Sequence, residues 1–546
     1  MKHFKFKSVV SLANAKLSIK SAAIVLACST LLSALLGIYR DYLLNSYYLQ
    51  TYPTGIDAYT AAFTIPDFMF FILTSGALAV SFIPVFNQRL ASGNKKSAWE
   101  LSSSMINLLA ILTLIASVLI MIFAEPLIRY VVSPGLDESG MILAINMTRV
   151  IALNPFLFSI STVLTSIQQS VGRFVFYAFA PALYNIGIII GTVVFTNGIN
   201  IFGAQLFDGG IMGVALGVIL GAIFQLIISL IGLFGLGVDY EFKIYWKNQG
   251  FRSILKLLPA RSLDQGIDYV NSIVNTNLSS RMGAGAVRAF NQASSLSQMP
   301  VNLIGVAIST AFFPKFTEQI NEGNEQEFHD TFRTAVRTIL WISLPVAIIA
   351  FFGRGYVVSF ISNLKNGEGN VMIASVLGAL CLSIFARSVF HIASRGFYAY
   401  QDTKTPFIVS ILAVGSTILL SIVFYNFGFG AIGLGYAQSI GAIFEITILL
   451  YILNKRSKKK LLNRTFWIST FKMLFATIIA GCVAYSMTKF IPLMATDTSI
   501  WTTLPKFCLI TIISLIAYLV ASYFLGLTEV EPIVKYLKKV IFKNIE

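Results

Sequence analysis

The sequence predicts an all-α polytopic membrane protein with about fourteen transmembrane helices. Of its 546 residues, 56% are hydrophobic and only 12% are charged, a composition that soluble globular proteins of this length do not have. Apolar stretches of about 20 residues recur along the chain, the length that crosses a bilayer. The net charge of +16 comes from short basic clusters between these stretches, so it indicates membrane topology rather than a nucleic-acid partner.

The apolar stretches follow one another with short connections. The first comes after a basic leader and is too long for the apolar part of a signal peptide, so we expect it to be retained. In chain order they lie at 21–46, 58–88, 104–131, 142–170, 176–197, 209–236, 252–279, 288–317, 331–360, 371–400, 405–427, 429–454, 466–490 and 502–526.

Basic residues follow the even-numbered stretches, as in the run KRSKKK at 455–460. The opposite connections, such as 133–140 and 494–499, are acidic or neutral. By the positive-inside rule, both termini are predicted to be cytoplasmic.

An internal repeat divides the chain. FIPVFNQRLASGN at 82–94 matches FFPKFTEQINEGN at 312–324, with Pro84 and Pro314 in equivalent places. Both copies end an even-numbered stretch, so we expect a parallel repeat of two pseudo-symmetric six-helix lobes that move against each other. The last two stretches are additional helices, and the basic segment 529–546 is predicted to be an amphipathic cytoplasmic tail.

Motifs in both halves carry a family resemblance. They are LLGIYRD (35–41), GIDAYTAAFTIPDF (55–68), SGALAVSFIPVF (75–86), GRF…AFAPALYNI (172–186), PVNLIGVAISTAFFP (300–314) and SRGFYAYQDTKTP (394–406). Their order and spacing resemble the lipid II flippase (MurJ/MviN) family of the multidrug/oligosaccharidyl-lipid/polysaccharide exporter superfamily.

The resemblance implies a V-shaped flippase in the bacterial inner membrane. It would carry an undecaprenyl-diphosphate-linked peptidoglycan precursor between leaflets by alternating access, as a monomer, among membrane lipids and beside cell-wall synthesis enzymes. The implied parts are an N-lobe (1–236), a cytoplasmic linker (237–251), a C-lobe (252–455), a lipid-tail groove (456–528) and the tail (529–546).

Several cavity residues depart from the family. Where members usually carry arginines, this chain has Ala34, Phe70, Phe71 and Ser295. Ser75 and Gln298 replace two family acids. The usual cationic receptor for the diphosphate is therefore missing from its usual place, and an aromatic wall would suit a less anionic cargo.

Other charged residues within the apolar stretches are candidates to replace it, because a diphosphate needs cationic, preferably forked donors. For cargo binding we expect Arg40, Asp57, Arg261, Arg288 and Arg387. For gating or ion coupling we expect Asp41, Asp264, Asp268 and His391, with Asp268 also a candidate sodium ligand.

Each candidate has a structural alternative. Arg40 and Asp41 could brace their helix, and Asp57 could be a helix N-cap. Arg288 could extend to the membrane interface. Arg261, Asp264 and Asp268 could form a structural ion pair at the cytoplasmic mouth, while His391 could simply be packed.

The sequence has no P-loop, and the spacing of its residues indicates no catalytic site. We therefore expect a transporter rather than an enzyme, without a cofactor. Its driving force would be an ion gradient, the membrane potential or the cargo gradient itself, and the family resemblance implies the membrane potential or a cation such as sodium. Three alternatives stay open: a flippase for another polyprenyl-linked glycan, a drug or organic-cation exporter of the same superfamily, and a non-transporting scaffold for envelope assembly.

Overall fold

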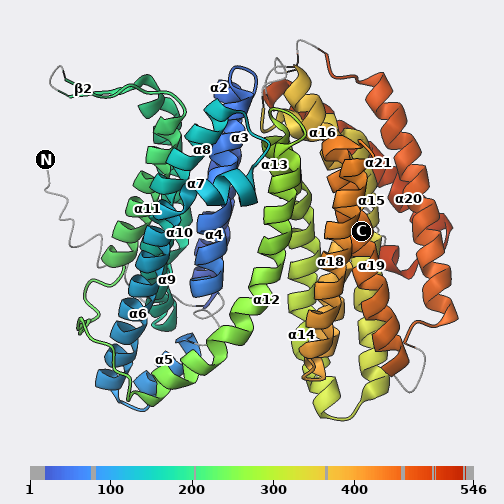
Figure 1. Cartoon of the computed structure of the whole chain (residues 1–546). Helices are drawn as coiled ribbons and strands as arrows, with labels where there is room; N and C mark the ends of the chain where they lie inside the picture. Colours follow the sequence, from blue (N-terminus) through green and yellow to red (C-terminus); the bar gives the residue numbers. More distant parts are fainter. Residues whose placement is uncertain are drawn as a thin grey trace, which may run out of the picture. The chain divides into compact units, whose positions relative to one another are not determined.

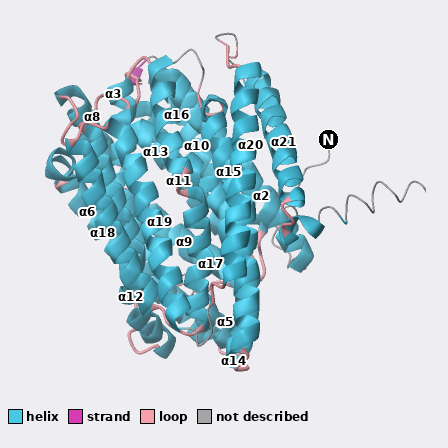
Figure 2. Cartoon of the chain, turned by 90° about the vertical axis from the view of Figure 1, so that its right-hand side faces the viewer, coloured by secondary structure: helices cyan, strands magenta, loops and turns pink. Residues whose placement is uncertain are grey.

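The computed structural model describes residues 19–75, 82–201, 204–362, 367–456, 461–494, 497, 500–532 and 535, without the side chains of 19, 20, 22, 23, 75, 200, 201, 204, 206, 257–265 and 268. Helices make up nearly all of this part of the chain (Figure 2), so the predicted all-α fold class is confirmed. Much of the predicted tail and residues 457–460 of the basic run lie outside the described residues.

The chain divides into two compact units, Met1–Val287 and Arg288–Glu546. The predicted lobe and linker boundaries stay predictions. The first unit contains the following elements, of which Figure 1 labels the α-helices and β2: α2 (Ile19–Tyr48), α3 (Pro53–Ala62), α4 (Thr64–Phe70), η1 (Phe71–Ser75), α5 (Ile83–Ala91), α6 (Lys95–Ile122), α7 (Ala124–Pro126), η3 (Leu127–Val132), α8 (Glu138–Ile151), α9 (Asn154–Ser170), α10 (Val175–Val193), η4 (Phe195–Asn197), β1 (Ile199–Ile201), β2 (Ala204–Phe207), α11 (Met212–Ile231) and α12 (Gln249–Ser280).

The second unit is described from α13, which begins two residues before the boundary. Its elements are α13 (Ala286–Val301), η5 (Asn302–Val306), α14 (Ala307–Asn321), α15 (Glu325–Ser359), α16 (Gly367–Cys381), α17 (Ile384–Ala399), α18 (Lys404–Asn426), α19 (Gly430–Arg456), α20 (Arg464–Phe490), α21 (Ile500–Phe524) and η6 (Thr528–Val530).

Twelve helical segments of the described chain are long and apolar enough to cross a membrane, and the pair α16–α17, bent by 45°, makes a thirteenth if it is one span. The remaining predicted stretch, 252–279, is helix α12. It has 32 residues, about 48 Å at 1.5 Å per residue, but its second half is rich in Asn and Ser. Helix α12 is therefore long enough to cross a membrane, and the crossing itself stays a prediction.

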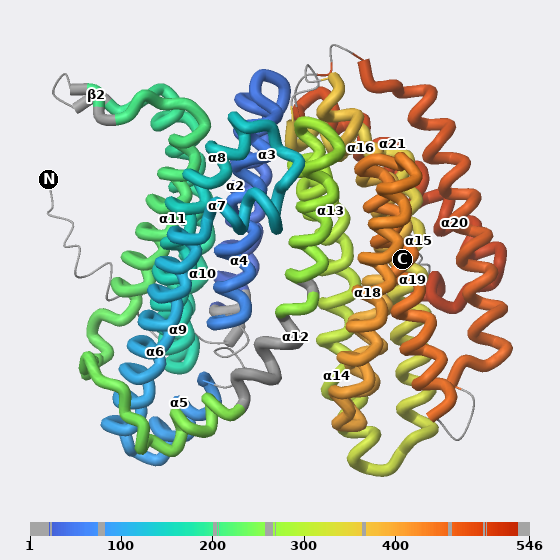
Figure 3. Tube along the Cα trace, in the orientation of Figure 1, coloured from blue at the N-terminus to red at the C-terminus, as the bar shows by residue number. Residues whose placement is uncertain are grey.

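Helices α10 and α11 lie side by side (Figure 3), and glycines allow their close contact. The short antiparallel hairpin β1–β2, which lies between them in the chain, was not predicted from the sequence. A Cβ added to Gly187 would lie 2.3 Å from the Gly221 Cα, and one added to Gly217 would lie 2.5 Å from the Gly191 Cα. Such small-residue contacts let helices approach closely inside a membrane.

The two copies of the sequence repeat fold into the same turn. Gly93 and Gly323 have φ of 77° and 76°. The N–H of Asn94 donates to the Arg89 carbonyl at 3.0 Å, and the N–H of Asn324 donates to the Gln319 carbonyl at 2.9 Å. Phe86 and Phe316 are both fully buried behind these turns. The repeat therefore preserves a helix-ending motif in which glycine takes the left-handed conformation.

The segment after α11 lies along α6. Asn107 donates to the carbonyls of Glu241 and Lys243 at 2.8 and 3.0 Å, and the N–H of Tyr245 donates to the Ser104 hydroxyl at 2.8 Å. Polar residues of a membrane helix thus satisfy the backbone of the predicted linker, which fixes the start of α12.

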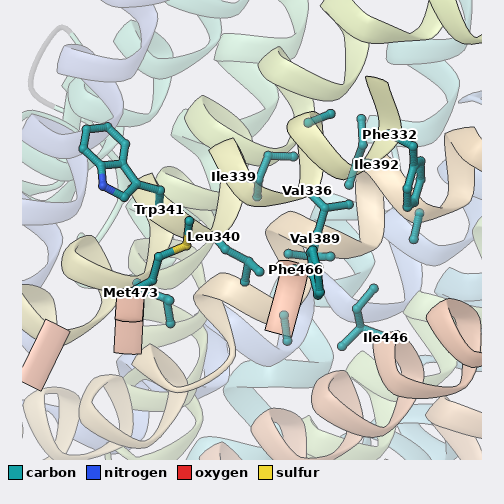
Figure 4. Packing of buried hydrophobic residues seen from close by; sticks show 14 of the residues in the cluster. Phe332, Val336, Ile339, Leu340, Trp341, Val389, Ile392, Ile446, Phe466 and Met473 are labelled. Carbon is teal, nitrogen blue, oxygen red and sulfur yellow. The ribbon is translucent and has the colours of Figure 1, made fainter. Parts of the chain in front are cut away.

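The core of the second unit is built from helices distant in sequence. Figure 4 shows Val336 and Leu340 of α15 packing with Val389 of α17, Ile446 of α19 and Met473 of α20. Helix α20, one of the two predicted additional helices, is therefore an integral part of this core rather than a peripheral attachment.

Candidate functional site

Arg40 lies in a polar cluster between α2 and α10. Its guanidinium is 3.0 Å from Asp41 Oδ1, and Nη1 donates to Asn185 Oδ1 at 2.9 Å. Asn185 in turn donates to the Ser33 carbonyl at 3.2 Å. The adjacent residues Arg40 and Asp41 therefore form a pair, and Asn185 of the AFAPALYNI motif is a functional candidate that sequence reasoning did not single out.

An aromatic cluster contains Phe70 and Phe71, which stand where members of the resembled family usually carry arginines. Phe71 stacks on Tyr269 of α12, with ring centroids 4.6 Å apart. Phe70 contacts Phe158 of α9 edge to face at 5.6 Å, and Phe158 contacts Tyr184 in the same way at 5.1 Å. Since Tyr184 precedes Asn185, this apolar wall continues directly into the Arg40 cluster.

Asp57 connects α3 to the turn between α12 and α13. It is 1% exposed, and its Oδ2 accepts a hydrogen bond from the Gly285 N–H at 2.6 Å. Helix α3 begins at Pro53, with Tyr52 as the N-cap residue, so the N-cap alternative for Asp57 is wrong. Gly285 has φ of 86°, a conformation that suits glycine.

Arg288 is a buried cation near the start of α13, with 4% of its surface exposed. With the Gln292 amide turned so that its oxygen faces the guanidinium, Oε1 lies 3.0 and 2.8 Å from Nη1 and Nη2. Ser295, where the family arginine would stand, is exposed. Burial and the bidentate amide contact do not support the interfacial alternative for Arg288.

The basic residues Arg387, His391 and Arg395 of α17, of which the first two were predicted site residues, have different neighbours. Arg387 donates to Gln438 Oε1 of α19 at 2.7 Å, and the Arg395 guanidinium lies 5.8 Å from the ring centroid of Phe313 in α14. His391 contacts the Phe390 ring edge to face and lies close to Gly305 of η5. In the described part of the chain, Arg387 has no carboxylate within ion-pair distance.

The side chains of Arg261, Asp264 and Asp268 lie outside the described residues, so their predicted roles stay predictions. Within the described residues, no three His, Cys, Asp or Glu side chains lie close enough together to hold a metal ion.

Asp402, at the turn between α17 and α18, holds elements of the second unit together. Its carboxylate accepts from the Thr405 N–H at 3.0 Å and pairs with Arg456 of α19 at 2.8 Å. Burial raises the pKa of Asp402, but these hydrogen bonds and the Arg456 charge outweigh it, so the pKa is below its usual value. Asp402 therefore acts as a brace between helices.

The chain matches the family model described as lipid II flippase MurJ over residues 46–504. It is 26% identical over 517 residues to the probable lipid II flippase MurJ of Buchnera aphidicola subsp. Schizaphis graminum, covering 94% of this chain and 98% of that protein. It is 26% identical over 440 residues to the lipid II flippase MurJ of Burkholderia cenocepacia, covering 78% and 82%.

Solved structures show the same fold. A lipid II flippase MurJ in an inward closed conformation superposes with a TM-score of 0.73 at 22% identity, covering 96% of this chain and 99% of that one. An inward-facing multidrug transporter of the MATE family superposes with a TM-score of 0.65 at 17% identity, covering 80% and 98%. Because the family model matches well over half of the sequence, the chain belongs to the lipid II flippase MurJ family.

Proposed function

We propose that this protein moves lipid II, the undecaprenyl-diphosphate-linked peptidoglycan precursor, from the inner to the outer leaflet of the bacterial inner membrane by alternating access. The family match over residues 46–504 carries the proposal. Lipid II is the cargo named for the family and for the curated relatives. Membership makes the chain a transporter rather than a catalytic enzyme.

Three arginines of the described chain supply the cationic chemistry that this cargo requires. Arg40, Arg288 and Arg387 each have a carboxamide partner, namely Asn185, Gln292 and Gln438. A neutral amide orients a guanidinium without cancelling its charge. A guanidinium held in this way can still bind a diphosphate through its remaining N–H groups.

We assign Arg288 and Arg387 to diphosphate binding, because a carboxamide orients each of these forked cations. Arg288 and Arg387 would supply the positive charge that Phe70 and Phe71 cannot supply at the usual arginine positions of the family. Asp57, which contacts the α12–α13 turn, suits a gating role between the conformations better than direct contact with an anionic cargo.

Energy coupling is proposed to come from the membrane potential or a sodium gradient, with Asp268 as the candidate sodium ligand. We further propose that the protein works as a monomer beside cell-wall synthesis enzymes, with both termini cytoplasmic. Replacing external sodium with choline at constant membrane potential tests the coupling, and unchanged transport would exclude sodium.

The cargo assignment is tested by depleting the native flippase in a bacterium, expressing this chain and measuring lipid II accessible from outside. Restored accessibility is the expected result. Failure to restore it, with the protein stably inserted, would overturn the lipid II assignment. Assaying other polyprenyl-diphosphate glycans in the same cells would then identify a different glycan cargo.

Arg288→Gln and Arg387→Gln test the binding residues. Each is expected to lower transport by about tenfold or more, because a lost charge-assisted bond is worth about 1.5–3 kcal/mol. Arg149→Gln is the control, since Arg149 is exposed and its contact is to a backbone carbonyl. Full transport by the double variant would exclude both residues from cargo binding.

A further inference from the structure

A cavity of about 550 Å³ opens at one end of the second unit, where α15 and α20 end and α16 begins. Arg354 and Lys489 contribute cations to its lining, and Phe351, Tyr356 and Tyr485 contribute rings. All of its lining residues belong to the second unit. Its lining includes neither Arg387 nor its partner Gln438.

The two cations of this cavity are held without acidic partners. Arg354 Nη1 donates to the Phe351 carbonyl at 2.6 Å, and its guanidinium lies 5.0 Å from the Phe351 ring centroid. Lys489 Nζ lies 5.7 Å from the Tyr485 ring centroid. Neither cation is within ion-pair distance of a carboxylate in the described residues. Two like charges therefore face one cavity, where an anion would relieve their repulsion.

The rim of the cavity is fixed by a buried acid that already has its own cation. Pro492 and Leu493 line the cavity. Asp497, 4% exposed, accepts from the Met494 N–H at 2.8 Å and pairs with Lys506 at 2.6 Å. The Tyr356 hydroxyl donates to the Ile491 carbonyl from the other side. Asp497 therefore does not neutralise Arg354 or Lys489, and the rim is preformed.

An exposed apolar stripe on α20 leads to Lys489. Phe471, Phe475, Ile478 and Tyr485 are 67%, 56%, 61% and 51% exposed. Together with the exposed Cys482, they follow the alternating spacing of four and three that keeps residues on one helix face. Since α20 is a candidate membrane span, this face offers a path for a hydrocarbon chain that ends at the two cations.

We propose that the cavity binds the phosphate headgroup of an anionic lipid whose hydrocarbon chain lies along this stripe of α20. Arg354 supplies forked donors, Lys489 supplies a point charge, and Tyr485 stands where headgroup and chain meet, as interfacial aromatic residues do. The proposed occupant is a bulk anionic phospholipid, represented by phosphatidylglycerol. The proposal goes beyond cargo transport and does not depend on it.

The test uses the full-length protein in a neutral detergent and follows its thermal unfolding with added lipid. Phosphatidylglycerol is expected to raise the midpoint, and phosphatidylcholine with the same chains is not, because a ligand that binds only the folded state stabilises it. Undecaprenyl phosphate is the third lipid. It is expected to bind no more tightly than phosphatidylglycerol, and tighter binding would overturn the assignment to a bulk phospholipid.

Variants of the cavity residues test whether the stabilisation by phosphatidylglycerol arises from binding at this cavity. Lys489→Gln and Arg354→Gln are each expected to weaken the phosphatidylglycerol response by about tenfold in concentration. Arg464→Gln is the matched control, because it removes an exposed charge from the other end of α20. Lys489 is exposed, so its variant keeps the test valid if the Arg354 variant does not fold.

An undiminished rise of the thermal midpoint with phosphatidylglycerol in Lys489→Gln would overturn the assignment of lipid binding to this cavity. So would equal stabilisation by phosphatidylcholine. Glycerol phosphate, which has the headgroup chemistry without the chain, is expected to act only at far higher concentration, and an equal response to it would overturn the assignment of the stripe to a lipid chain.

Discussion

At the scale of single residues, Asp57 illustrates how a buried carboxylate can hold a turn that lies far along the chain. Its hydrogen bond to the Gly285 N–H connects α3 to a turn that follows α12. Asp57→Ala would leave that N–H without its acceptor, and an unsatisfied buried donor costs about 1–3 kcal/mol. We expect a lower thermal midpoint and reduced lipid II accessibility at normal expression.

Asp208→Ala is the control, because Asp208 is an exposed acid beside the β1–β2 hairpin. Asp57→Asn keeps an acceptor oxygen, so its thermal midpoint and lipid II accessibility are expected to lie between those of Asp57→Ala and Asp208→Ala. Wild-type stability and transport in Asp57→Ala would show that the contact has no role.

Asp402 gives a pH-dependent prediction. A carboxyl with a folded-state pKa below its usual 3.8 stabilises the protein above that pH, and the contribution is lost as pH falls through the folded-state value. Asp402→Asn is therefore expected to lower stability at pH 7, by about 1 kcal/mol or less for a partly exposed ion pair.

The difference between wild type and Asp402→Asn is expected to shrink below pH 3.8. Thermal melts of both proteins in detergent across this range measure it. A difference that stays constant with pH would mean that the charge of Asp402 is not what stabilises the turn.

Sequence reasoning at this scale located charges but not their partners. It identified Arg40, Arg288 and Arg387, whereas Asn185, Gln292 and Gln438 were missed. Amides are common on helices and have no distinctive spacing, so only the three-dimensional packing shows which ones face a guanidinium. The Asp57 contact was missed for the same reason, because its acceptor role depends on a backbone N–H far along the chain.

At the scale of helices, the α10–α11 contact depends on the absence of side chains. A Cβ at Gly217 would lie 2.5 Å from the Gly191 Cα, whereas one at Gly415 of α18 would meet nothing within 4 Å. Gly217→Ala is expected to destabilise the protein by roughly 1–3 kcal/mol through overpacking. Gly415→Ala, the matched control, is expected to be neutral or stabilising. Thermal midpoints that fall equally would contradict this account.

The repeated turn gives a paired prediction. Gly93 and Gly323 have nearly the same positive φ and open space around them, so alanine meets backbone strain but no clash. Gly93→Ala and Gly323→Ala are each expected to cost about 1–2 kcal/mol. The two asparagine variants are expected to cost less, since Asn tolerates this conformation. Unequal midpoints for the two alanine variants would mean that the turns differ in their surroundings.

The repeat was predictable because its glycine, asparagine and phenylalanine each have a defined structural role in one turn. The β1–β2 hairpin was not, because three- and four-residue strands in a polar connection carry too short a pattern. The break between α16 and α17 was likewise hidden within a continuous apolar stretch.

At the scale of the whole molecule, the question is whether α12 crosses the membrane. Five candidate spans separate Gly93 from Gly323 without α12, which would place the two equivalent turns on opposite sides. With α12 there are six crossings, and both turns lie on one side. The matching geometry of the turns and the basic residues near both favour six.

Cysteine labelling decides between these topologies. In a chain with Cys28, Cys381, Cys482 and Cys508 replaced by serine, Ser92→Cys and Glu322→Cys are both expected to resist a membrane-impermeant maleimide in intact cells and to react after permeabilisation. Asp208→Cys, in the connection on the opposite side, is expected to react at once. All three positions are exposed, so a difference in labelling reports the side of the membrane. Reaction of Glu322→Cys but not Ser92→Cys in intact cells would mean that α12 does not cross, and that the C-terminus lies outside.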